Sequence, residues 1–228
     1  MSAILVYGPS GSGKSTAIEN LPAEMTGIIC SDSKPLPFKG WKNKYKTKFG
    51  ENGKMMPAES NYIETKKPPS VMKVLQAWNI RDEIKTIVWD TMTHVIMYRF
   101  MTDPKVDWDF YKVLAREIYE ILNFIQTMKK DVIVIGHNDT KFDAASGSKI
   151  DAVQTIGRLL DEKVNIPSLF TVVLTTLVTK DGDGKPEYLF RTQSDGSNFA
   201  KSPKGMFERL TIPNDYNLVL QKIHEYYE

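Results

Sequence analysis

Cysteine is almost absent from this sequence, because Cys30 is the only one among its 228 residues. A single thiol forms no disulfide within the chain and supplies no cluster of thiolates for zinc. We therefore expect Cys30 to be a small buried side chain in a protein of a reducing compartment, the cytoplasm.

Long hydrophobic runs are also absent. No stretch reaches about 18 consecutive apolar residues, the length that a helix needs to cross a bilayer. The chain enters through the apolar residues 3–7 without a basic leader segment. We expect neither export nor a membrane-spanning segment.

The sequence has little net charge, since 30 basic residues stand against 28 acidic ones and the formal charge is +2. The global balance therefore does not indicate a nucleic-acid-binding protein, and any such signal has to be local. Residues 34–69 carry a local signal, because nine lysines there stand against three glutamates, a net charge of +6.

Aromatic residues alternate with these lysines in residues 34–69, namely Phe38, Trp41, Tyr45, Phe49 and Tyr62. Ammonium groups and stacking rings in one segment suit single-stranded DNA. Equally, the rings can anchor an ordered insertion on the core while the lysines stay in water. The sequence leaves both interpretations open.

Short apolar runs bounded by turn residues indicate buried strands. They lie at residues 4–7, 27–30, 86–89, 132–135 and 170–178. Helical patterns are expected from Lys14 and near residues 71–83, 110–128, 152–163 and 215–227, and a polar loop at residues 138–149. Strands that alternate with helices predict an α/β fold, with a mostly parallel twisted sheet flanked by helices. We expect one domain over residues 1–228, with residues 34–69 as an insertion.

A phosphate-binding motif follows the first predicted strand. Residues 8–15 read GPSGSGKS, which satisfies G-x-x-x-x-G-K-[ST] between a strand and a helical pattern. Glycines allow successive backbone N–H groups to point inward at phosphate oxygens. The motif predicts a cradle for the phosphates of ATP, made by Gly8, Pro9, Ser10, Gly11, Ser12, Gly13, Lys14 and Ser15. We expect Lys14 to reach the β- and γ-phosphates and Ser15 to ligate Mg²⁺.

The third predicted strand ends in Asp90. In P-loop enzymes an Asp in this position holds Mg²⁺ through water, from a strand that neighbours the first. An Asp at a strand end is also a common turn or cap residue. Together with the cradle, we favour the magnesium role.

Hydrolysis needs a group that orients or deprotonates water in line with the γ-phosphate. Asp32 follows the second predicted strand and His137 follows the fourth, at the strand ends where an open sheet binds its ligand. We take Asp32 as the candidate for water and His137 as the candidate that senses the γ-phosphate. The alternatives are a turn Asp and a surface His.

Three blocks of sequence, residues 33–41, 155–163 and 193–207, are more specific than the phosphate motif. Through them the chain resembles the phage RecA-like P-loop ATPases, AAA-type ATP-binding proteins that include single-strand annealing proteins. The resemblance runs over nearly the whole chain and implies a RecA-like core that uses ATP and Mg²⁺. It also implies that Thr16 lines the α-phosphate side and that Asp32 takes the catalytic position, where RecA itself has Glu. In the RecA pattern an amide follows the fourth strand, where this chain has His137 and Asn138.

The same resemblance implies partners. RecA relatives contact DNA through the loop that corresponds to residues 140–150, and they complete their site with basic residues from a neighbouring subunit. Arg191, Lys201 and Lys204 are the candidates for that role, and the alternative is that they only keep a C-terminal hairpin solvated. We therefore expect a homo-oligomer, single-stranded DNA and phage replication or recombination proteins as partners, in the cytoplasm of a bacterial host.

The leading expectation is a Mg²⁺-dependent ATPase that acts on single-stranded DNA in phage recombination, annealing or replication. One alternative is a nucleotide-gated binding or loading module with little hydrolysis. Another is a small-molecule kinase, which is less favoured because such enzymes commonly close an arginine-rich lid over the phosphates. The arginines of this chain are few and scattered.

Overall fold

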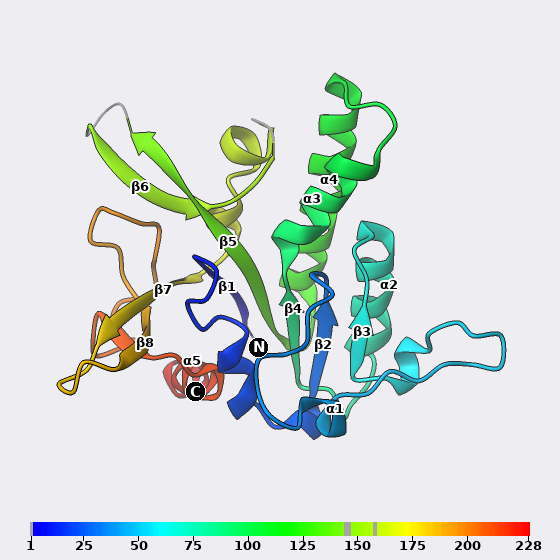
Figure 1. The fold of residues 1–228 in the computed structure, drawn as a ribbon, viewed down its shortest axis with the longest axis horizontal. Coiled ribbons are helices and arrows are strands. Elements are labelled where there is room, and N and C mark those ends of the chain that lie inside the picture. The colour runs from blue at the N-terminus through cyan, green and yellow to red at the C-terminus, as the bar shows by residue number, and fades with distance from the viewer. Residues whose placement is uncertain (1, 144–146, 157–158) are drawn as a thin grey trace.

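A large twisted sheet forms the centre of the computed structural model, which describes residues 2–143, 147–156 and 159–228. Within these residues, nine strands form one sheet in the order β3-β2-β4-β5-β1-β7-β8-β9, with β6 paired to β5 outside that path (Figure 1). The strands are β1 Ala3–Gly8, β2 Thr26–Cys30, β3 Tyr62–Glu64, β4 Thr86–Asp90, β5 Asp131–Asp143, β6 Ser148–Val153, β7 Val172–Lys180, β8 Pro186–Arg191 and β9 Thr211–Pro213.

Along the sheet, β3, β2, β4, β5, β1 and β7 pair in parallel, and β8 and β9 add an antiparallel edge. The apolar runs explain this arrangement. Ile4, Leu5 and Val6 of β1 are all fully buried, and a strand buried on both faces needs apolar residues at successive positions. The predicted α/β fold with a mostly parallel sheet is confirmed.

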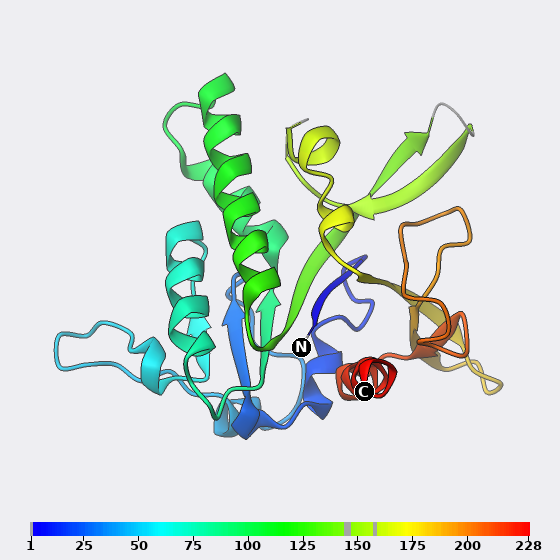
Figure 2. The same ribbon diagram turned by 180° about the vertical axis from the view of Figure 1, so that it is seen from behind.

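Helices cover both faces of the sheet (Figures 1 and 2). The α-helices are α1 Trp41–Lys44, α2 Pro68–Asn79, α3 Met92–Thr102, α4 Trp108–Thr127 and α5 Tyr216–Tyr227. Shorter helices are the 3-10 helices Thr16–Asn20, Ala23–Met25, Pro57–Glu59 and Ile166–Leu169 and the π-helix Leu159–Val164. Apolar residues of α2, α3 and α4 pack on one face, and those of Thr16–Asn20 and α5 pack on the other.

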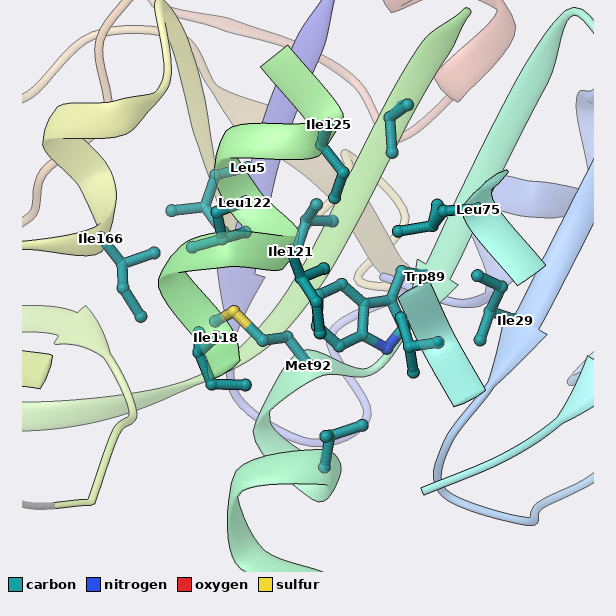
Figure 3. Packing of buried hydrophobic residues seen from close by; sticks show 14 of the residues in the cluster. Leu5, Ile29, Leu75, Trp89, Met92, Ile118, Ile121, Leu122, Ile125 and Ile166 are labelled. Carbon is teal, nitrogen blue, oxygen red and sulfur yellow. The ribbon is translucent and has the colours of Figure 1, made fainter. Parts of the chain in front are cut away.

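The predicted apolar stripe on α4 is present. Ile118, Ile121 and Ile125 are buried against the sheet, where Trp89 and Leu5 meet them (Figure 3). The helix begins where the Asp107 side chain accepts a hydrogen bond of 3.0 Å from the Phe110 N–H. The spacing of every three or four residues therefore gives both the position and the buried face of this helix.

A helix follows Lys14 as expected, but it begins at Thr16 and is a 3-10 helix instead of an α-helix. The structure has a five-residue 3-10 helix, Thr16–Asn20, after the phosphate loop. Pro22 follows in an extended conformation and cannot donate a helical hydrogen bond, and β2 already begins at Thr26. Pro22 and the start of β2 therefore keep the helix after the phosphate loop short.

Two further expectations for residues 138–163 are wrong. The polar loop at residues 138–149 is mostly an antiparallel hairpin, in which β5 continues to Asp143 and pairs with β6. The helix expected at residues 152–163 is reduced to the π-helix Leu159–Val164, since β6 extends to Val153. β-branched residues such as Thr140 and Ile150 favour a strand over a loop. Residues 144–146 of the expected DNA-contacting loop and residues 157–158 of the 155–163 block lie outside the described residues.

The helix α3 was missing from the predicted elements. Its buried residues include the β-branched Thr93, Val95 and Ile96. β-branched side chains have a lower helix propensity, and this weakens the helical signal of the segment.

The insertion of residues 34–69 is ordered on the core. Phe38, Tyr45 and Tyr62 are buried, and the ring centroid of Trp41 lies 5.2 Å from that of Tyr62. Phe49 is the exception, with 62% of its surface exposed. The interpretation of the aromatic residues as anchors is therefore correct for four of the five, while eight of the nine lysines remain exposed.

The described part of the chain contains no helix that is both long enough and apolar enough to cross a membrane.

Candidate nucleotide-binding site

A cleft lies at the carboxyl ends of the parallel strands. The strand register brings Cys30 level with Asp90 and Gly8 level with His137. Open parallel sheets bind their ligands at this edge. The cleft is lined by Ser10, Gly11, Ser12, Gly13, Lys14, Ser15, Thr16, Asp32, Lys34, Pro35, Leu36, Pro37, Asp90, Thr91, His137 and Tyr188.

The phosphate loop has the backbone geometry that its glycines allow. Gly11 and Gly13 have φ angles of 77° and 90°, in the region that side chains with a Cβ rarely adopt. At Gly8 the constraint is steric, because a Cβ would lie 1.7 Å from the Thr176 hydroxyl oxygen. The loop therefore depends on glycine at three positions for two different physical reasons.

Strand β7 holds the phosphate loop in place through a hydrogen bond. Thr176 donates a hydrogen bond of 2.7 Å from its hydroxyl to the Ser12 hydroxyl oxygen, and Ser12 donates one of 2.7 Å to the Pro9 carbonyl. Both side chains are buried, so these bonds are shielded from competition with water. This chain of bonds fixes the loop on a strand that lies far away in the sequence.

Lys14 is buried inside the loop. Its ammonium donates to the Gly8 carbonyl at 2.7 Å and to the Pro9 carbonyl at 2.6 Å. Burial lowers the pKa of Lys14 to about 8, and the negative charge of Asp90 opposes that shift. The group is therefore still mostly protonated at pH 7. Phosphate oxygens are stronger acceptors than carbonyl oxygens, so this ammonium is ready to turn to a phosphate.

Asp90 is buried beside Ser15. Burial raises the pKa of Asp90 to about 6, while a hydrogen bond from Ser15 and the charge of Lys14 lower it. Its Oδ1 atom has no hydrogen-bond partner among the described residues. A buried carboxylate oxygen without a partner is costly, which points to a ligand that is bound during function. Mg²⁺ prefers carboxylate and hydroxyl oxygens and keeps several waters, so Asp90 and Ser15 fit it.

Asp90 does not come from a neighbour of the first strand, and that part of the expectation is wrong. Strand β5 lies between β1 and β4 and pairs in parallel with both. Asp90 still reaches the cleft, because the three strands end at the same edge of the sheet.

The Asp32 side chain accepts hydrogen bonds within the turn after β2 and also lines the cleft. Its Oδ1 accepts hydrogen bonds from the Lys34 N–H at 3.0 Å and from the Cys30 thiol at 3.3 Å. Its Oδ2 lies 3.7 Å from the Lys34 ammonium nitrogen. One carboxylate oxygen is thus hydrogen-bonded within the turn, and the other lies near the exposed Lys34 ammonium.

His137 follows Gly136 in β5 and is half-buried, so it does not lie free on the surface. The backbone N–H of His137 donates a hydrogen bond of 2.9 Å to the Thr93 hydroxyl oxygen. The His137 ring packs edge-on against the His94 ring, with the ring centroids 5.3 Å apart. Burial lowers the pKa of His137 to about 4, with further contributions from the charges of Lys14 and His94. The ring is therefore neutral at pH 7 and offers one donor and one acceptor.

The basic residues expected to act on a neighbouring subunit do not line the cleft of their own chain. Arg191 lies on β8 opposite Thr175, and Lys201 exchanges two backbone hydrogen bonds of 2.8 Å with Val173. Lys204 is exposed. Their role in a neighbouring site stays a prediction.

Several residues of the site were missing from the sequence-based prediction. Tyr188 and Asn214 flank Gly13, where a Cβ would lie 3.1 Å from the Tyr188 Cδ1 and 3.1 Å from the Asn214 Oδ1. Neither residue belongs to a recognisable motif. Lys34 was recognisable in principle, because it follows Asp32 within the block of residues 33–41.

Comparison with known protein families gives a match over most of the chain. A family model described as an AAA domain matches residues 2–203, which include the phosphate loop, Asp32, Asp90 and His137. The match ends before Asn214 and α5. It supports the AAA-type part of the resemblance, whereas the phage RecA-like part stays a prediction. No curated protein matches the chain.

The bond between Thr176 and Ser12 should be measurable through nucleotide affinity. We expect Thr176→Val to weaken binding of Mg·ATP about fivefold, because the loop loses one hydrogen bond of roughly 1 kcal/mol. Thr175→Val is the matched control, since the buried Thr175 hydroxyl has no partner among the described residues. Isothermal titration calorimetry of both variants checks this. Equal affinities in the two variants would contradict the support role of Thr176.

The environment of His137 predicts a pH dependence. Its pKa is about 4 in the folded protein against an ordinary value of 6.5, so the folded state excludes a proton that the unfolded chain accepts. This contribution to stability is complete above pH 6.5 and is lost as the pH falls from 6.5 toward 4. NMR titration of the His137 ring protons should show a midpoint near 4. A midpoint near 6.5 would mean that the ring is solvated.

Proposed function

We propose that this chain, which belongs to the AAA domain family, binds ATP and hydrolyses it with Mg²⁺. One observation carries the proposal. Lys14, Ser15 and Asp90 converge in one cleft, and the buried Asp90 carboxylate keeps an oxygen without a partner among the described residues. A cation, a hydroxyl and a carboxylate in this arrangement are what a metal-bound triphosphate needs.

Different residues of the cleft bind the phosphates and the metal. Backbone N–H groups of the loop and the Lys14 ammonium bind the β- and γ-phosphates, and Thr16 lies on the α-phosphate side. Ser15 and Asp90 would hold the metal. Mg²⁺, when bound, supplies positive charge at the β- and γ-phosphate oxygens.

Asp32 and His137 serve the chemical step. Water attacks the γ-phosphorus, the bond to the β–γ bridging oxygen breaks, and a proton of the water passes to Asp32. ADP and inorganic phosphate are the products. The neutral His137 ring contacts the γ-phosphate through one nitrogen, so it senses that group without adding charge.

We propose further that single-stranded DNA is the target of this ATPase. Two features project from the body of the molecule, the part of the insertion between α1 and β3 and the β5–β6 hairpin (Figure 1). The insertion carries exposed lysines and the exposed Phe49, and the hairpin carries Phe142, which is 70% exposed. Ammonium groups pair with phosphates, and exposed rings stack on bases.

The resemblance through residues 33–41 and 193–207 supports the setting of this activity. We propose a homo-oligomer in the bacterial host cytoplasm, which works with phage recombination or replication proteins. Arg191, Lys201 or Lys204 would then reach the γ-phosphate of a neighbouring subunit, where a cation stabilises the charge of the transition state.

One observation favours a second candidate function, a nucleotide-gated module with little hydrolysis. Oδ1 of Asp32 is held by the Lys34 N–H and the Cys30 thiol, and Oδ2 faces the Lys34 ammonium. Carboxylate oxygens with these partners are less available to accept a hydrogen bond from water than free ones. Such a module would bind ATP and release almost no phosphate.

Two variants separate binding from chemistry. Lys14→Ala should abolish both ATP binding and turnover, because the phosphates lose their buried cation. Asp32→Asn should keep the affinity for Mg·ATP within about threefold while turnover falls about 100-fold. Calorimetry and phosphate release with and without single-stranded DNA measure these effects. Unchanged turnover in purified Lys14→Ala would defeat the ATPase assignment, and wild-type binding without any phosphate release would establish the module.

The DNA proposal is tested by salt dependence. Replacing the exposed Lys44 and Lys46 with Gln should reduce the slope of log affinity against log salt by about 1.4, since each phosphate contact contributes about 0.7 for single strands. The matched control replaces Lys180 and Lys185, which are exposed on the β7–β8 turn. Fluorescence titration with single-stranded DNA at two salt concentrations measures both slopes. The same slope in the two double variants would remove the insertion from the DNA interface.

A further inference from the structure

The turn after β2 holds a lysine against the cleft. Ser33 has a φ of 58°, a left-handed conformation that side chains rarely adopt. The Asp32 carboxylate fixes this turn through its bond of 3.0 Å from the Lys34 N–H. After the turn, Leu36 is buried in the same apolar cluster as Ala17 and Ile18, which follow the phosphate loop. The turn is thus anchored at both ends, and Lys34 lies between the anchors.

The Lys34 side chain reaches into the same space as the phosphate loop. It lines the cleft together with Lys14, Asp90 and His137. Its positive charge lowers the pKa of each of these three groups. The Lys34 side chain places its ammonium nitrogen 3.7 Å from Oδ2 of Asp32, which lines the same cleft. The Lys34 side chain is also 65% exposed, so it is free to move toward a ligand.

We infer that Lys34 recognises the γ-phosphate, as a cation supplied by the same chain from the turn after β2. This inference rests on the proposed ATP binding. Lys14 belongs to the phosphate loop and Lys34 to the turn after β2, and both line the same cleft. A γ-phosphate oxygen is a charged acceptor that forms a stronger hydrogen bond than an exposed ion pair at 3.7 Å. ADP lacks this acceptor, so Lys34 distinguishes the two nucleotides.

Recognition of the γ-phosphate also changes the state of Asp32. When the Lys34 ammonium turns to the phosphate, Oδ2 of Asp32 loses its ion pair while Oδ1 stays bonded to the Lys34 N–H. Oδ2 is then available to accept a hydrogen bond from water. Lys34 would thus couple the presence of ATP to the availability of the carboxylate.

The ratio of the affinities for Mg·ATP and Mg·ADP tests the inference. We expect Lys34→Ala to weaken ATP binding about tenfold and ADP binding less than about twofold, because only ATP carries the terminal charge. Lys34→Arg should restore most of the ratio, since a cation remains. Lys73→Ala is the control, because Lys73 is exposed on α2 and does not line the cleft. Isothermal titration calorimetry measures both dissociation constants for each variant.

Two outcomes would overturn the inference in distinguishable ways. If the wild type binds both nucleotides and Lys34→Ala leaves the ATP-to-ADP ratio unchanged, then Lys34 only solvates the turn and the proposed ATP binding still stands. If the wild type binds neither nucleotide, the proposed function fails and takes this inference with it. A lower thermal midpoint with an unchanged ratio also counts against recognition, because a structural role would give that result.

Discussion

The parallel pairing of β5 with β1 on one side and with β4 on the other fixes the geometry of the cleft. The pairing sets Gly8 level with His137, and it sets Trp89 level with Val134 so that Asp90 ends at the same edge. A register shift of one residue would turn each of these side chains to the other face of the sheet. The buried apolar residues on both faces exclude that shift, so core packing and site geometry are one constraint.

Signals that lie within a few residues of each other were enough to predict the centre of the structure. The apolar runs gave the parallel strands except β3, and the stripe of Ile118, Ile121 and Ile125 gave α4 with its buried face. The phosphate motif named the loop, because glycine, lysine and serine at that spacing serve one chemistry. Strand ends placed Asp90 in the same cleft, although the position of β5 between β1 and β4 was not foreseen.

Contacts between distant parts of the sequence explain what could not be predicted. Thr176 supports Ser12 across 164 residues, and Tyr188 and Asn214 reach Gly13 from the C-terminal strands. No local pattern marks such residues, because their position depends on how the whole sheet assembles. Composition was equally unable to separate the buried ring of Tyr45 from the exposed ring of Phe49, since both alternate with lysines in the same segment.

The balance of charge in the cleft suggests how nucleotide binding and assembly are connected. Two ammonium groups, Lys14 and Lys34, face two carboxylates, Asp32 and Asp90, and burial keeps His137 neutral. A triphosphate with its metal is still negative, so the described lining of this chain does not neutralise it fully. Charge spreads over the γ-phosphate oxygens in the transition state, which increases the need for a further cation. In the proposed homo-oligomer a neighbouring subunit would supply that cation, and a contact completed in this way would form and break with the state of the nucleotide.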